Sequence, residues 1–203
     1  MSLKTFFEKG KVEVGCDEAG RGCLAGPVYA AAVILDPKKR NSLLDDSKKL
    51  SKTNRDELRI WIEKNALAWA VGVVDQKEID EINILNASFL AMHRAIDQIR
   101  LPFNSLLIDG NRFNPYPKAE HHCIIKGDGK FKAIAAASIL AKTHRDEYMQ
   151  KIAVEFPHYD WQNNQGYPTK KHRAAILSNG KCVHHRNSFR LVPDQMVLNF
   201  KNS

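Results

Sequence analysis

The chain has 203 residues, of which 43% are hydrophobic and 27% charged, and this composition is typical of an ordinary globular protein. Its four cysteines form no CxxC pair, which argues against a disulfide scaffold or a zinc ribbon and favours a reducing cytoplasm. No apolar run approaches the roughly 18 residues of a membrane span, and residues 1–15 lack the apolar core of a signal peptide. We therefore expect neither secretion nor membrane insertion.

The charge of the chain is unevenly distributed. Lysine and arginine outnumber aspartate and glutamate by 31 to 23, and between residues 157 and 203 there are seven basic residues against two acidic ones. A basic excess of this kind favours a polyanionic partner such as nucleic acid. We expect a monomer with a single domain over residues 1–203, a basic helical part from about residue 157 and a flexible tail over 193–203.

The first elements in chain order are strands. A short strand over 12–16 and a buried strand over 28–35, joined by a glycine-containing loop, predict a hairpin. Helical spacing over 51–64 is followed by an alternating strand over 66–74. These three strands are consecutive, and we expect them to be antiparallel in part.

Helices and short strands alternate in the rest of the chain. Asp75 and Glu78 form a capping-box pattern that begins a helical region, and an apolar stripe continues it to about Ile99. Short strands are predicted over 105–108 and 123–125, and helices over 133–156 and 169–178. The expected fold class is α/β, with a five-stranded mixed sheet flanked by helices and a C-terminal helical segment.

Acidic residues stand where the predicted strands end. Asp17 and Glu18 follow the first strand, Asp109 ends the fourth, and Asp128 follows the fifth. Strand ends can meet at one sheet edge, where ligands of α/β folds bind. Clustered carboxylates need a neutralising cation, and oxygen donors favour Mg²⁺ or Mn²⁺ over zinc. The alternative is that each aspartate only forms a turn beside a glycine.

A glycine-rich loop follows the first acidic pair. Gly20 and Gly22 allow close approach of the backbone to a ligand, and Arg21 between them can bind phosphate or sugar oxygens. With Gly26 the spacing is similar to a dinucleotide-binding fingerprint. That alternative is disfavoured because Pro27 leads into a strand, whereas the fingerprint requires a helix to begin at the glycines.

Several aromatic and histidine residues near the C-terminus leave alternatives open. His184 and His185, with Cys182 nearby, lack the usual spacing of zinc ligands and suggest surface or supporting roles. Trp161 is either a core residue or a platform for base stacking. We expect His172, beside two lysines, to be solvated.

Seven motifs occur in the order in which they are found in ribonuclease HII, the bacterial type 2 ribonuclease H. They are GCDEAGRGCLAGPV at 15–28, DDSKKLS at 45–51, LIDG at 107–110, KGDGK at 126–130, AIAAASILAKTHRD at 133–146, GYPT at 166–169 and HHRNSF at 184–189. The chain resembles this family from about residue 12 to residue 192. It departs from the pattern at Phe131 and at 163–165, where a His-Lys pair is common, so one phosphate contact is expected to be missing.

The resemblance implies a ribonuclease H fold and a function in ribonucleotide excision repair and in removing hybrids. The implied reaction is hydrolysis of the RNA strand of RNA–DNA hybrids and cleavage 5′ of single ribonucleotides in duplex DNA, which gives 3′-hydroxyl and 5′-phosphate ends. The implied catalytic and metal-binding residues, for two Mg²⁺ or Mn²⁺ ions, are Asp17, Glu18, Asp109 and Asp128. The implied substrate-binding residues are Gly20, Arg21, Gly22, Asp46, Ser47, Lys48, Ser138, Lys142, Arg145 and Tyr167, with Tyr167 stacking near the RNA–DNA junction and Asp146 in a supporting role.

The C-terminal tail carries a further pattern. Gln195, Leu198 and Phe200 form a QxxLxF sequence that resembles peptides docking onto the bacterial sliding clamp. The alternative is an ordinary amphipathic terminal helix.

Two other functions remain as rivals. A non-catalytic hybrid-binding module would have no reason to collect four acids where an anionic backbone must lie. A DNA nuclease of the same fold would share the acids but lack the Gly20–Gly22 loop.

Overall fold

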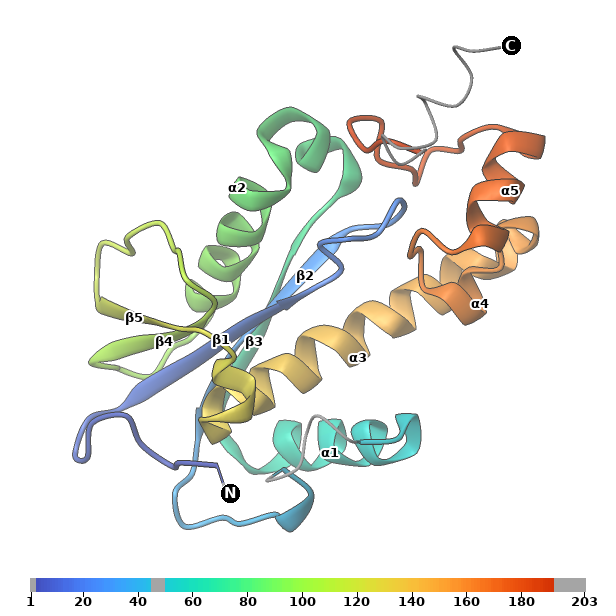
Figure 1. Ribbon diagram of the computed structural model, residues 1–203. Helices are drawn as coiled ribbons and strands as arrows, with labels where there is room; N and C mark the ends of the chain where they lie inside the picture. Colours follow the sequence, from blue (N-terminus) through green and yellow to red (C-terminus); the bar gives the residue numbers. More distant parts are fainter. Residues whose placement is uncertain (1–2, 45–49, 192–203) are drawn as a thin grey trace.

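The computed structural model describes residues 3–44 and 50–191 and shows a five-stranded sheet with helices on both faces (Figure 1). The strands are β1 (Glu13–Ala19), β2 (Val28–Leu35), β3 (Ala66–Val74), β4 (Ser105–Asp109) and β5 (Glu120–Ile124). Their order is β3-β2-β1-β4-β5; β1, β4 and β5 are mutually parallel, and β2 is antiparallel to β1 and β3. The predicted α/β fold with a mixed sheet is confirmed.

The helices, except the short one over 161–164 that was not predicted, agree with the sequence prediction in type and order. They are α1 (Lys52–Asn65), α2 (Gln76–Ile96), α3 (Lys132–Glu155), α4 (Trp161–Asn164) and α5 (Lys170–Asn179), with short 3₁₀ turns η2 (Gly127–Gly129) and η3 (Pro157–Tyr159). The capping box of Asp75 and Glu78 begins α2 as predicted, and Asn83 interrupts this helix with a φ of 65°. In the part of the chain that the structure describes, no helix is long and apolar enough to cross a membrane.

Two strands differ from their predicted extents. Asp17 and Glu18 lie inside β1 rather than after it, because they pair with Ala31 and Ala30 of β2. Strand β5 begins three residues earlier than predicted, at Glu120, which pairs with Ser105 of β4. In both cases pairing with a neighbouring strand overrides the local sequence pattern.

Each face of the sheet packs against different helices. On one face, Val14 and Cys16 of β1 join the core formed with α2, and on the other face the alanine-rich part of α3 and the buried side of α1 form a second core. Figure 1 shows α2 on one side of the sheet and α1 and α3 on the other. A Cβ on Gly15 would clash with the backbone of Ala133, so this glycine lets α3 begin directly against β1. As a result α3 lies beside the acidic end of the strand.

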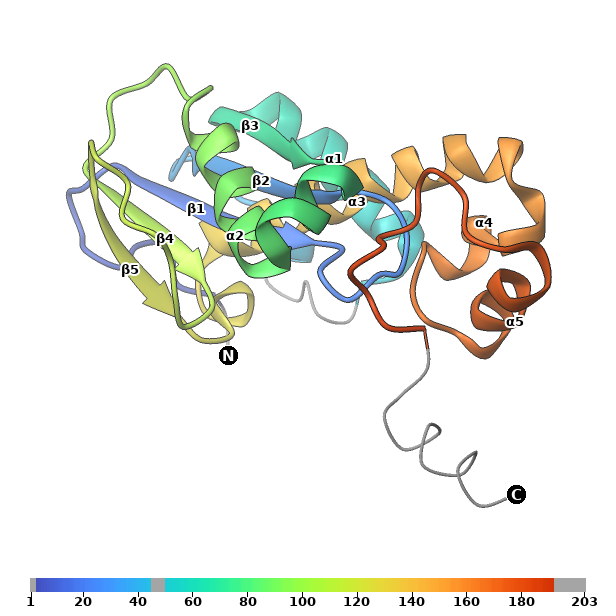
Figure 2. The same ribbon diagram turned by 90° about the horizontal axis from the view of Figure 1, so that it is seen from above.

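The C-terminal helices form a separate cluster at the far end of α3 (Figure 2). Trp161, for which the sequence left two alternatives, is fully buried in this cluster and is therefore a core residue. The expectation that His172 is solvated was wrong, since its side chain is also fully buried. Its ring satisfies its polar atoms inside the protein, because Nε2 accepts a hydrogen bond from Trp161 Nε1 at 2.9 Å and Nδ1 lies 2.9 Å from the carbonyl of Tyr167.

Candidate active site

The predicted acidic residues lie at one edge of the sheet. Asp17 and Glu18 are near the carboxyl end of β1, Asp109 is the last residue of β4, and Asp128 lies in η2, four residues after β5. Because β1, β4 and β5 are parallel neighbours, their carboxyl ends meet at the same edge of the sheet. Residues more than a hundred positions apart in the sequence are brought together in this way.

A short hydrogen bond connects the ends of β4 and β5. The backbone N–H of Gly127 donates to Oδ1 of Asp109 at 2.6 Å. A Cβ on Gly127 would lie 2.6 Å from Cδ1 of Ile134 and 3.3 Å from Oδ1 of Asp109, so a larger residue would have to displace the end of the Ile134 side chain and crowd this hydrogen bond. The hydrogen bond holds the turn that carries Asp128 against the carboxylate of Asp109.

The carboxylates near β1 influence each other. Asp17 is 6% exposed, and burial raises the pKa of its carboxyl well above the ordinary value. The neighbouring charges of Glu18 and Asp109 raise it further, whereas hydrogen bonds from the Ser138 hydroxyl and the Glu18 N–H lower it. Burial also raises the pKa of Glu18, and the ion pair with Arg21 opposes that shift. Such a set favours binding of a positive charge, either protons or a cation.

The donor chemistry at this edge fits a hard divalent cation, since all the donors are carboxylate oxygens. Within residues 3–44 and 50–191, however, no three Asp, Glu, His or Cys side chains are gathered closely enough to hold a metal ion. The side chains interact with protein groups instead. Glu18 pairs with Arg21 at 3.0 Å, and Asp109 accepts from Gly127. Like charges repel each other when no cation lies between them. This repulsion accounts for Glu18 and Asp109 turning toward different protein partners.

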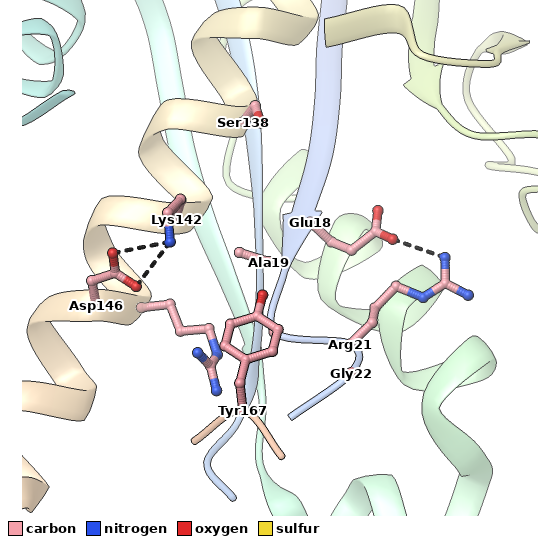
Figure 3. Close-up of a pocket in the computed structure, with 10 residues that line it drawn as sticks. Glu18, Ala19, Arg21, Gly22, Ser138, Lys142, Asp146 and Tyr167 are labelled. Carbon is pink, nitrogen blue, oxygen red and sulfur yellow. Dashed lines mark hydrogen bonds and ion pairs between the residues drawn. The ribbon is translucent and has the colours of Figure 1, made fainter. Parts of the chain in front are cut away.

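A cleft lies beside Glu18. Its walls come from the end of β1, the loop after it, helix α3 and the turn before α5; they are Glu18, Ala19, Gly20, Arg21, Gly22, Ser138, Lys142, Arg145, Asp146 and Tyr167. In Figure 3 the ion pair of Lys142 with Asp146 stands on one side of the cleft and that of Arg21 with Glu18 on the other, with the Tyr167 ring between them. Every predicted substrate-binding residue within the described ranges lines this cleft. Asp46, Ser47 and Lys48 lie outside the described residues.

Two buried arginines hold the loop 20–27 from beneath. The guanidinium of Arg145, from α3, donates to the carbonyls of Ala25, Pro27 and Gln165 at 2.9–3.1 Å. The guanidinium of Arg186 donates to the carbonyls of Gly20, Arg21 and Gly26 at 2.7–3.0 Å. Sequence reasoning did not single out Arg186, although the HHRNSF motif contains it. Both side chains are at most 1% exposed, so these contacts support the loop.

Comparisons with known proteins agree with this arrangement. The family model described as Ribonuclease HII matches residues 14–192. A ribonuclease HII from Bacteroides thetaiotaomicron is 62% identical over 199 residues, covering 98% of this chain and all of that protein. The chain belongs to the ribonuclease HII family. As a ribonuclease HII it is a hydrolase, an endoribonuclease that acts on RNA–DNA hybrids and on ribonucleotides embedded in DNA, and the two rival functions are set aside. Family membership implies a divalent metal cofactor.

Solved structures show the same ribonuclease HII fold. The ribonuclease HII in a PCNA complex from Archaeoglobus fulgidus matches with a TM-score of 0.73 and 26% identity, covering 90% of this chain and 96% of that one. The ribonuclease H2 from Pyrococcus horikoshii also has a TM-score of 0.73, at 23% identity, covering 94% of this chain and 99% of that one. The arrangement of sheet and helices is therefore that of the ribonuclease HII structures.

Proposed function

We propose that the cleft in Figure 3 and the acidic edge beside it form the active site, with Asp17, Glu18, Asp109 and Asp128 as the metal-binding residues. The support is that three neighbouring parallel strands bring these acids to one edge, and that the buried Asp17 and the partly buried Glu18 have carboxyls whose pKa values are raised. Two Mg²⁺ or Mn²⁺ ions bound there would supply an activated water and neutralise the leaving 3′-oxygen.

Several other residues of the cleft bind and orient the substrate, whereas the buried Arg145 supports the loop. The backbone of Gly20, Arg21 and Gly22 contacts the 2′-hydroxyl, which distinguishes RNA from DNA without reading bases. Tyr167, 42% exposed, stacks beside the DNA side of the junction. Lys142 extends from α3 into the cleft, where its ammonium group attracts a backbone phosphate and Asp146 holds it at 3.2 Å.

One observation carries this assignment. Residues from β1, the following loop, α3 and the Tyr167 turn line a single cleft, and the acidic strand end opens into it through Glu18. An anionic backbone can therefore lie against the basic and glycine-lined walls while the bond to be cleaved faces the carboxylates. Because one chain supplies all of these walls, we also propose that the enzyme acts as a monomer. We propose the cytoplasm as its location.

The test is cleavage of an end-labelled DNA duplex that contains one ribonucleotide, compared with an all-DNA duplex. With Mg²⁺ or Mn²⁺ we expect a single cut on the 5′ side of the ribonucleotide, leaving 3′-hydroxyl and 5′-phosphate ends. With EDTA, and with the all-DNA duplex, we expect no cut. Cleavage of both duplexes, or of neither, would overturn the proposal.

We also propose that the C-terminal tail binds the sliding clamp through Gln195, Leu198 and Phe200, which lie outside the described residues. The QxxLxF pattern supports this, and the ribonuclease HII of Archaeoglobus fulgidus was solved in a complex with PCNA. Gln195→Ala combined with Phe200→Ala should weaken binding to purified bacterial clamp at least about tenfold, a loss of about 1.4 kcal/mol. Cleavage of a free duplex should not change. Undiminished clamp binding would contradict this role.

A further inference from the structure

A short extended segment, His184–Arg186, lies directly behind the loop that faces the substrate. It runs antiparallel to residues 24–26, because the N–H of Gly26 donates to the carbonyl of His184 at 2.8 Å and the N–H of Arg186 donates to that of Leu24 at 2.9 Å. Side chains alternate in direction along extended backbone. His185 and Arg186 therefore point to opposite sides of this segment.

Arg186 fixes the orientation of two peptide groups in the loop. Its guanidinium donates to the carbonyls of Gly20 and Arg21 at 2.7 and 2.8 Å. In a trans peptide the C=O and the following N–H point in opposite directions. With both carbonyls directed at the buried guanidinium, the N–H groups of Arg21 and Gly22 point away from it, toward the side of the loop that lines the cleft.

On the opposite side of the segment, His185 contacts His172, which in turn contacts the backbone of Tyr167. The N–H of Cys182 donates to His185 Nδ1 at 3.0 Å, so the ring proton of His185 is on Nε2, 3.3 Å from Nε2 of His172. Since His172 Nε2 also accepts from Trp161, its own proton is on Nδ1, which donates to the Tyr167 carbonyl at 2.9 Å. Trp161, at the shorter distance, and His185 therefore share the one lone pair of His172 Nε2, and His172 in turn donates to the carbonyl of the residue proposed to contact the junction.

We propose that His184–Arg186 is a positioning segment that holds the two substrate-recognising elements at a fixed separation. Arg186 positions the Gly20–Gly22 loop, and His185, through His172, positions Tyr167. This inference rests on the proposed function of the cleft. Neither residue touches the substrate; both act through groups that do.

The first test measures binding in an Asp17→Asn background with Mg²⁺, so that cleavage does not interfere. The substrates are a duplex with one ribonucleotide and the matching all-DNA duplex. In Arg186→Lys, the preference for the ribonucleotide should fall about fivefold or more, because a lysine cannot fork onto two carbonyls. Affinity for the all-DNA duplex should stay within about twofold, since the charge is retained.

The control variant is Met92→Ala, which leaves a cavity in the core between α2 and the sheet and touches no part of the segment. It should lower the melting temperature without changing the ribonucleotide preference. An unchanged preference in Arg186→Lys, or an equal loss in Met92→Ala, would overturn the inference. No preference in the Asp17→Asn parent would instead overturn the proposed function of the loop.

A second variant tests the proposed positioning of Tyr167 through His172 and remains informative if Arg186→Lys fails to fold. His172→Met keeps a weak acceptor for Trp161 but has no donor for the Tyr167 carbonyl. Cleavage at a single embedded ribonucleotide should fall about fivefold relative to cleavage of a continuous RNA–DNA hybrid. Equal losses on the two substrates would show a merely structural role and would contradict the inference.

Discussion

Gly20 lies directly against the side chain of Arg145. Its backbone has a φ of 95°, and a Cβ at this position would clash with Nε and Cδ of Arg145. Gly22 differs in both respects, because its φ is outside the left-handed region and a Cβ there would meet no atom within 4 Å. The fold therefore requires glycine at position 20 but not at position 22, where we propose that an approaching substrate requires it.

The two glycines should respond differently to alanine. Gly20→Ala should lower the free energy of unfolding by about 1–3 kcal/mol because the backbone and the Arg145 contact are strained. Gly22→Ala should melt like the wild type, yet raise KM for a duplex with one ribonucleotide, since the new methyl group occupies the space that the substrate needs. Thermal melting and steady-state kinetics check both. Wild-type kinetics for Gly22→Ala would show that the ligand does not approach there.

Removing one carboxylate charge should stop the reaction but not substrate binding. Asp109→Asn keeps an oxygen that can accept from Gly127, so the turn should remain in place. Turnover should fall about a thousandfold or more, a loss of about 4 kcal/mol in transition-state stabilisation, and Asp17→Asn should behave alike. Asp56→Asn, at an exposed position on α1, is the matched control. Near-normal turnover in either variant would reject these metal-binding roles.

Arg21 should contribute to nucleic-acid binding rather than to metal binding. Its side chain is 50% exposed and pairs with Glu18 at 3.0 Å. Arg21→Ala should weaken duplex affinity and lower the slope of log affinity against log salt by about one, as expected for one lost phosphate contact. Affinity for Mn²⁺ should not fall, because Glu18 loses a competing cation. A loss of Mn²⁺ affinity as large as that in Asp17→Asn would refute this role.

The buried histidine pair should make stability depend on pH. Burial lowers the pKa of His185 to about 4, and the nearby His172 and Lys181 act in the same direction. The imidazole of His185 takes up a proton near pH 6.5 in the unfolded chain but only near pH 4 in the folded chain. Its contribution to the free energy of unfolding is therefore full above pH 6.5 and is lost as the pH falls toward 4. The loss should be about 2–3 kcal/mol.

Urea unfolding between pH 7.5 and 4.5 checks this dependence. The comparison with His185→Gln isolates the contribution of this histidine from that of the carboxyl groups, since Asp17, with its raised pKa, changes stability in the opposite sense. The slope of the free energy of unfolding against pH should flatten in His185→Gln. It should remain in His158→Gln, which alters an exposed histidine. An unchanged slope in His185→Gln would contradict the assignment.

Much of this protein followed from the sequence alone. Hydrophobic periodicity predicted the order of strands and helices, and the capping box of Asp75 and Glu78 begins a helix in the structure as it did in the prediction. The ordered motifs indicated the ribonuclease HII family before any fold was known. These features are local, since each depends on residues within a few positions of one another, and local patterns can be read directly from the chain.

Long-range contacts decided the rest. Pairing with β2 extended β1 through Asp17 and Glu18, and tertiary burial placed His172 in the core despite its lysine neighbours. The contacts of Arg186 with Gly20 and Arg21 span 166 and 165 positions. No spacing rule connects residues so far apart, because their proximity arises only when the sheet, α3 and the C-terminal segment pack together. The sequence by itself therefore determined the family and the candidate chemistry, and tertiary packing decided which buried groups hold that chemistry in place.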